Sequence, residues 1–69
     1  MQQTNFKKLP IPAYFTFNSI HYVKLTATKV RQFGIDTEKV IRSNPLVTYW
    51  GQDMGAFVNA VNKENDQVL

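Results

Sequence analysis

Apolar and polar positions are most clearly organised in residues 13–25, AYFTFNSIHYVKL. Aromatic and β-branched residues, which favour pleated strands, fill both halves of this run. Asn18 and Ser19 separate the halves, and asparagine tolerates the positive φ angle of a tight turn. The pattern therefore predicts a β-hairpin that turns at these two residues.

The length of the turn decides which side chains share a face of the hairpin. A two-residue loop pairs Phe15 with Tyr22, whereas a four-residue loop pairs Phe15 with Val23. Both arrangements place apolar side chains on both faces, so we expect the hairpin to lie at the centre of a sheet. The sequence leaves the pairing open.

The next segment, residues 26–33 (TATKVRQF), fits two structures. As a strand, it places Lys29, Arg31 and Phe33 on one face. As a helix, it ends at Gly34, which stands where a glycine after the last helical turn is expected. Strand and helix both remain open here.

Residues 36–43 are similarly short, and they end just before Asn44-Pro45. Because this segment contains adjacent β-branched residues, we favour a turn over residues 35–38 followed by a strand over residues 39–42. A short helical turn capped by Asp36 is the alternative.

A further strand and a helix complete the expected elements. Residues 46–50 (LVTYW) read as a strand. In the loop that follows, Asp53 can cap a helix whose apolar stripe contains Phe57, Val61 and Val58. The polar run NKENDQVL then offers no apolar face to join a core.

The expected fold class is a small α+β domain that is mostly β, with an antiparallel sheet and a short C-terminal helix. We place the domain over residues 13–62, after an extended arm of residues 1–12 that is either anchored to the body by Phe6 and Leu9 or frayed, and before a polar tail of residues 63–69. The chain has 69 residues and no cysteine, so its core must be supplemented by aromatic packing or by self-association.

Few residues in this sequence can perform chemistry. His21 is the single histidine, and no cysteine is present. A lone histidine in a strand is more often a packing residue than a general base, which needs a nucleophile and an orienting group. The three glycines lie outside any phosphate-binding loop. We therefore expect a non-enzymatic protein with no cofactor and no metal site.

Charge is distributed unevenly along the chain, whose formal net charge is +3. Seven of the eight basic residues precede Pro45, where only Asp36 and Glu38 oppose them. Lys63 and three acidic residues follow. A basic body of this kind suggests an anionic partner.

The hairpin resembles a pattern found in small phage and bacterial proteins of unknown function, in which an F-x-[FW] strand, a turn and a Y-V-K strand follow one another. Phe15, Phe17, Tyr22, Val23 and Lys24 match this pattern, whereas Ser19-Ile20 replaces the usual turn glycine. The resemblance implies a compact β domain and a phage-like origin. It implies no activity.

We expect a phage-type accessory or inhibitory protein that docks on an acidic surface of a host protein. Its cations would gather on one exterior patch while the rings fill the interior. The expected partner-binding residues are Lys24, Lys29, Arg31, Lys39, Arg42, Tyr49 and Trp50. Binding of single-stranded nucleic acid by the same basic and aromatic face is the alternative, and a self-assembling structural subunit is the third.

The expected location is the cytoplasm, which is the host cytoplasm if the chain is phage-encoded. No apolar run is long enough to span a membrane, and the first twelve residues lack the apolar core of a secretory signal. We therefore expect no membrane partner.

Overall fold

The predicted hairpin is the centre of the structure. In the computed structural model, which describes residues 2–67, strands β2 (Ala13–Phe17) and β3 (Ile20–Lys24) pair antiparallel, with Phe15 opposite Tyr22. The loop is therefore the two-residue one. Asn18 and Ser19 adopt φ angles of 52° and 65°, and two positive angles in succession match the right-handed twist of a hairpin.

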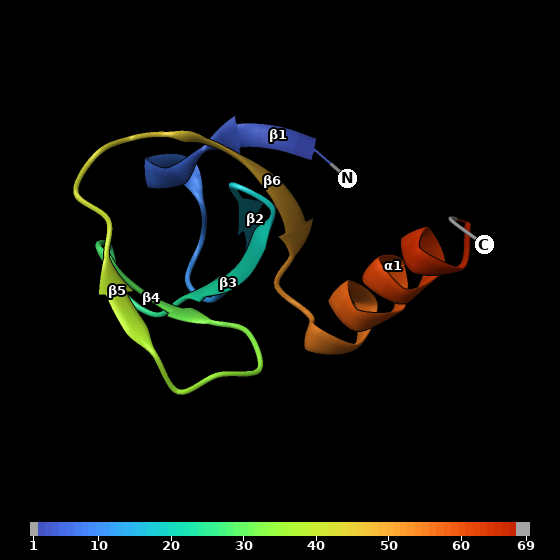
Figure 1. The fold of residues 1–69 in the computed structure, drawn as a ribbon. Helices are drawn as coiled ribbons and strands as arrows, with labels where there is room; N and C mark the ends of the chain where they lie inside the picture. Colours follow the sequence, from blue (N-terminus) through green and yellow to red (C-terminus); the bar gives the residue numbers. More distant parts are fainter. Residues whose placement is uncertain (1, 68–69) are drawn as a thin grey trace.

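Four further strands extend the hairpin into a six-stranded antiparallel sheet (Figure 1). They are β1 (Gln2–Asn5), β4 (Lys29–Gln32), β5 (Glu38–Val40) and β6 (Leu46–Gly51). The strand order is β1-β6-β2-β3-β4-β5, so the hairpin lies at the centre as expected. The mostly β class is confirmed, and the sheet in Figure 1 is strongly curled.

Both ambiguous segments form strands. In β4, Val30 is fully buried in the core. Its two charged neighbours, Lys29 and Arg31, point to the opposite face, as alternate residues of a strand do. A turn through Gly34, whose φ is +81°, leads into β5. A turn followed by a strand near Val40 is therefore confirmed, but the turn lies at residues 33–35 rather than 35–38, and the strand covers Glu38–Val40 rather than residues 39–42.

The core lies on the concave inner face of the sheet. Seven buried residues form it: Phe6, Leu9, Ala13, Phe15, Tyr22, Val30 and Val47. The Phe15 ring is at the centre, because its centroid lies 5.5 Å from that of Phe6 and 5.5 Å from that of Tyr22. Aromatic packing thus stabilises this small core, which has no disulfide bond because the chain has no cysteine.

The N-terminal segment belongs to this core, so it is part of the domain rather than an arm outside it, and the anchored alternative with Phe6 and Leu9 is confirmed. Strand β1 pairs with β6, and the short 3-10 helix η1 (Phe6–Lys8) follows it directly. The two apolar residues that flank the lysines, Phe6 and Leu9, are 0% and 5% exposed. They fix residues 2–9 to the body of the domain.

Lys24 is a structural residue, which corrects its expected role in partner binding. Its side chain lies on the inner face opposite Ala13, and the residue is 3% exposed. Its Nζ donates to the carbonyl oxygens of Phe6 and Leu9, each at 3.0 Å, and lies 4.6 Å from the centre of the Phe6 ring. The ammonium therefore connects β3 to η1 inside the molecule.

Helix α1 (Met54–Gln67) begins where the sequence predicted a cap. The Asp53 carboxylate accepts a hydrogen bond from the Gly55 N–H at 3.1 Å. The helix is longer than expected, because it includes most of the polar tail of residues 63–69; residues 68–69 lie outside the described part. Within residues 2–67, no helix combines the length and apolar character needed to cross a membrane.

Replacing Lys24 by methionine tests the interior role of this lysine. The variant keeps an apolar stem but removes the donor to two buried carbonyls, so we expect a loss of about 2 kcal/mol in the free energy of unfolding. The control is Lys8→Met, because Lys8 is exposed. Urea denaturation measures the free energy of unfolding of both variants. Equal values for the two would contradict the interior role of Lys24.

The same lysine predicts a dependence of stability on pH. Burial lowers the pKa of the Lys24 ammonium from its ordinary value of 10.5. Between the lowered pKa and 10.5, the unfolded chain therefore binds more protons than the folded one, so the contribution of Lys24 to stability increases as pH rises. We expect the stability of the wild type relative to Lys24→Met to be greater at pH 10 than at pH 7. A smaller stability difference between the wild type and Lys24→Met at pH 10 than at pH 7 would contradict a lowered pKa of Lys24.

Candidate functional site

The cations expected on one patch are divided between the two faces of the sheet. Val30 points into the core, so Lys29 and Arg31 on the same strand point to the outer face. Lys24 and Lys39 each lie opposite Val30 on a neighbouring strand, and share its inner face. The expectation of a single exterior patch was wrong, because alternate residues of β4 face opposite sides.

The two outer-face cations are balanced by carboxylates. Lys29 Nζ lies 3.7 Å from Glu38 Oε1, and Arg31 Nη1 lies 3.8 Å from Asp36 Oδ1. Solvent screens such exposed pairs, so each adds little stability. Their formal charges nevertheless cancel, and the outer face of β4 and β5 has no positive excess.

Four other cations are exposed, two on η1, one on β5 and one on the connection between β5 and β6, and we call this set the basic end. Its members are Lys7, Lys8, Lys39 and Arg42. Among the side chains that the structure describes, residues 2–63, no carboxylate forms an ion pair with any of them. This part of the surface therefore has an uncompensated positive charge.

Asn44 holds the two segments of the basic end together. Its Oδ1 accepts a hydrogen bond from the Lys7 N–H at 2.8 Å, and its carbonyl oxygen accepts one from Asn5 Nδ2 at 3.4 Å. Arg42 is two residues before Asn44 on the same connection between β5 and β6. Lys7 and Lys8 of η1 therefore lie near the connection that carries Arg42, although more than thirty positions separate them from it in the sequence.

Sequence reasoning missed Lys7 and Lys8, because residues 1–12 were interpreted as an arm. The signal was present in FKKL, where Phe6 and Leu9 are three residues apart on either side of the lysines. In a short turn with this spacing, the apolar residues at both ends are buried and the two lysines between them are exposed. Lys39 and Arg42 were expected, and both are exposed.

A second aromatic cluster lies on the outer face and holds helix α1. Phe57 from the first turns of α1 is 1% exposed. Its ring stacks on Tyr14, with centroids 5.1 Å apart, and contacts the edges of Phe33 at 4.9 Å and Trp50 at 6.2 Å. Phe57 is the only buried residue among residues 54–63 of α1, so it is the main attachment of this part of the helix.

Polar contacts beneath this cluster fix the orientation of two rings. Trp50 Nε1 donates to Thr16 Oγ1 at 2.8 Å, and the same hydroxyl is hydrogen-bonded to His21 Nδ1. The His21 ring also packs against Phe57, with centroids 5.5 Å apart. The packing role expected for His21 is confirmed.

Tyr49 and Trp50 point to opposite faces of β6, as adjacent strand residues do. Tyr49 packs against the inner core, and Trp50 belongs to the outer aromatic cluster. Both are half-buried. Their expected role as anchors for a partner stays a prediction, because both rings already take part in internal packing.

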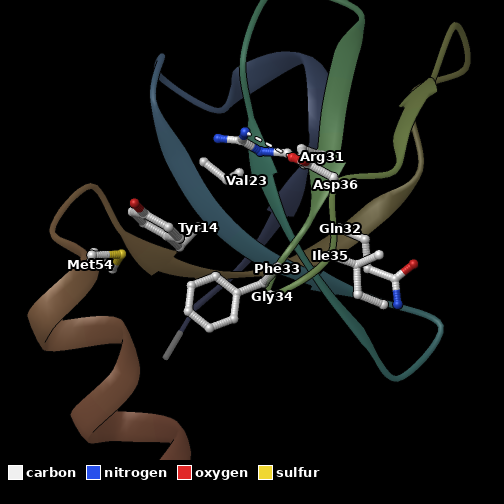
Figure 2. A pocket seen from close by; sticks show the side chains of 9 residues that line it. All are labelled: Tyr14, Val23, Arg31, Gln32, Phe33, Gly34, Ile35, Asp36 and Met54. Atoms are coloured by element: carbon white, nitrogen blue, oxygen red, sulfur yellow. Dashed lines mark ion pairs between the residues drawn. The ribbon is translucent and has the colours of Figure 1, made fainter.

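A groove of about 450 Å³ opens on the outer face between the sheet, the turn after β4 and the start of α1. It is lined by Tyr14, Val23, Arg31, Gln32, Phe33, Gly34, Ile35, Asp36 and Met54. Figure 2 shows Tyr14 and Met54 on one side of the groove and Ile35 on the other, with Arg31 and Asp36 joined as an ion pair. We call it the outer groove.

No family model, curated protein or solved structure matches this chain. The similarity to small phage and bacterial proteins stays a prediction. Function is therefore inferred from the basic end and the outer groove.

Replacing Phe57 by alanine tests the attachment of α1. Removal of a buried aromatic ring is expected to lower stability by about 3 kcal/mol. In the Phe57 variant, we expect the exchange of α1 amides with solvent to accelerate, relative to the wild type, more than that of the β2 and β3 amides. The control is Asn59→Ala on the exposed side of the helix. Unchanged exchange in α1 of the Phe57 variant would show that other contacts hold the helix.

Proposed function

We propose that this chain is a non-enzymatic protein-binding module that docks on an acidic surface of another protein through its basic end. One observation carries the proposal: four exposed cations, on η1, on β5 and on the connection between β5 and β6, form no ion pair among the side chains of residues 2–63. Uncompensated surface charge accelerates association with an oppositely charged partner and selects against partners of like charge.

Burial and pairing decide which of the expected cations contribute uncompensated positive charge to the surface. Lys24 is inside the molecule, and the charges of Lys29 and Arg31 are balanced by neighbouring carboxylates. Lys39 and Arg42 remain from the expected set. Lys7 and Lys8 join them, because η1 is fixed to the core at both ends.

The positions of the rings favour a protein partner over single-stranded nucleic acid. Single strands bind where bases stack on exposed aromatic faces beside cations. The rings that adjoin the basic end belong to Phe6 and Tyr22, which are 0% and 4% exposed. They offer no face on which a base could stack, so charge alone would have to hold a nucleic acid.

The predicted phage-like origin suggests the biological setting. A small phage-type accessory or inhibitory protein would use this surface to occupy an acidic site on a host protein. Such an action needs no catalytic group, and it agrees with the packing role of His21.

Charge removal at the basic end tests the proposal. The variant Lys39→Gln/Arg42→Gln and the control Lys29→Gln/Arg31→Gln each remove two positive charges. The wild type and both variants are used to capture proteins from a bacterial lysate. We expect an acidic protein that binds the wild type and the control, but binds the basic-end variant about tenfold more weakly.

Two results would contradict the proposal. One is equal weakening by both variants, which would indicate an effect of net charge alone. The other is tight binding of a single-stranded oligonucleotide that decreases steeply with salt and is lost in the basic-end variant, which would favour nucleic acid. Melting temperatures of the variants verify that both remain folded.

A further inference from the structure

We propose that the outer groove is a separate binding site for a peptide segment that presents a large apolar side chain next to a carboxylate. This site is distinct from the basic end, since the groove lies on the opposite face of β4 from Lys39. Its test is therefore independent of the proposed docking through η1.

The walls of the groove indicate an apolar side chain as the first part of the ligand. Tyr14, Val23 and Phe33 line it from the sheet and the turn that follows β4. Ile35 and Met54 line it as well, and they are 52% and 55% exposed. A ligand that covers them removes apolar surface from water, which is favourable in proportion to the area. The volume of about 450 Å³ is in the usual range for ligand sites.

Arg31 indicates a carboxylate as the second part. It is the single cationic side chain that lines the groove, and it is 45% exposed. Its contact with Asp36 is 3.8 Å long, whereas a strong charge-assisted hydrogen bond is about 2.7–2.9 Å. The guanidinium therefore has donors free for a bidentate contact with a carboxylate brought by the ligand.

Asp36 acts in this proposal as an internal competitor for Arg31. Its side chain is fully exposed on the turn after β4, so it can move away at little cost. Glu38 lies opposite Arg31 in the sheet register, but its carboxylate is paired with Lys29. Removing the charge of Asp36 alone should therefore leave Arg31 more available to the ligand.

The experiment is a titration of ¹⁵N-labelled full-length chain with three capped hexapeptides that differ only at two central residues. These are Phe-Glu, Phe-Gln and Ala-Glu, which separate the apolar part of recognition from the carboxylate. We expect the Phe-Glu peptide to shift the amides of residues 33–36 and to bind about fivefold more tightly than either of the others.

Three variants assign the preference to particular side chains. Arg31→Gln should abolish the preference for Phe-Glu over Phe-Gln, and Asp36→Asn should strengthen binding of Phe-Glu about two- to fivefold. Lys63→Gln is the control, since it removes an exposed cation of α1 that does not line the groove and leaves the pairing of Glu38 with Lys29 unchanged, and it should retain the preference. The amide spectrum of each variant verifies its fold.

Several outcomes would overturn the inference. They include no shift of residues 33–36 at millimolar peptide, equal binding of Phe-Glu and Phe-Gln, and weaker or unchanged binding by Asp36→Asn. Shifts of the same amides with protein concentration alone would identify a second copy of this chain as the occupant instead.

Discussion

The contact between the Lys24 ammonium and η1 is the constraint on which the rest of the structure depends. It joins the central hairpin to the N-terminal segment inside the core, through the carbonyl oxygen of Phe6, which also accepts the Leu9 N–H, and that of Leu9. Phe6 and Leu9 are held against the sheet on either side of it. This contact helps to fix η1 with Lys7 and Lys8 facing solvent, so it contributes both to stability and to half of the proposed binding surface.

Strand β2 supplies both aromatic clusters of this small domain. Phe15 faces the inner core, whereas Tyr14, its neighbour, faces the outer cluster around Phe57. A single strand thus connects the packing of η1 on one face with the packing of α1 on the other. The outer groove is a consequence of the second cluster, since Phe57 positions the start of α1, and hence Met54, beside the turn that contains Ile35.

Local patterns predicted the hairpin, the last strand and the helix cap, because each depends on neighbouring residues. Asn18-Ser19 defines the turn, and Asp53 caps α1 at the expected position. The candidate site was harder to predict, since the side on which a cation lies depends on strand register and pairing. Lys24 and Lys29 look alike in sequence, yet one is buried against carbonyls and the other pairs with Glu38. Sequence pattern shows that charges exist, but not which ones remain uncompensated.

The two edge strands of the sheet determine whether another molecule can pair with its main chain. One edge, β5, has only three residues and includes Glu38 and Lys39, while the other, β1, is polar throughout, QQTN. Short, charged or polar edge strands discourage the main-chain pairing through which sheets join edge to edge and aggregate. Such edges favour recognition through the shape and charge of side chains, which single substitutions can change while the backbone stays intact.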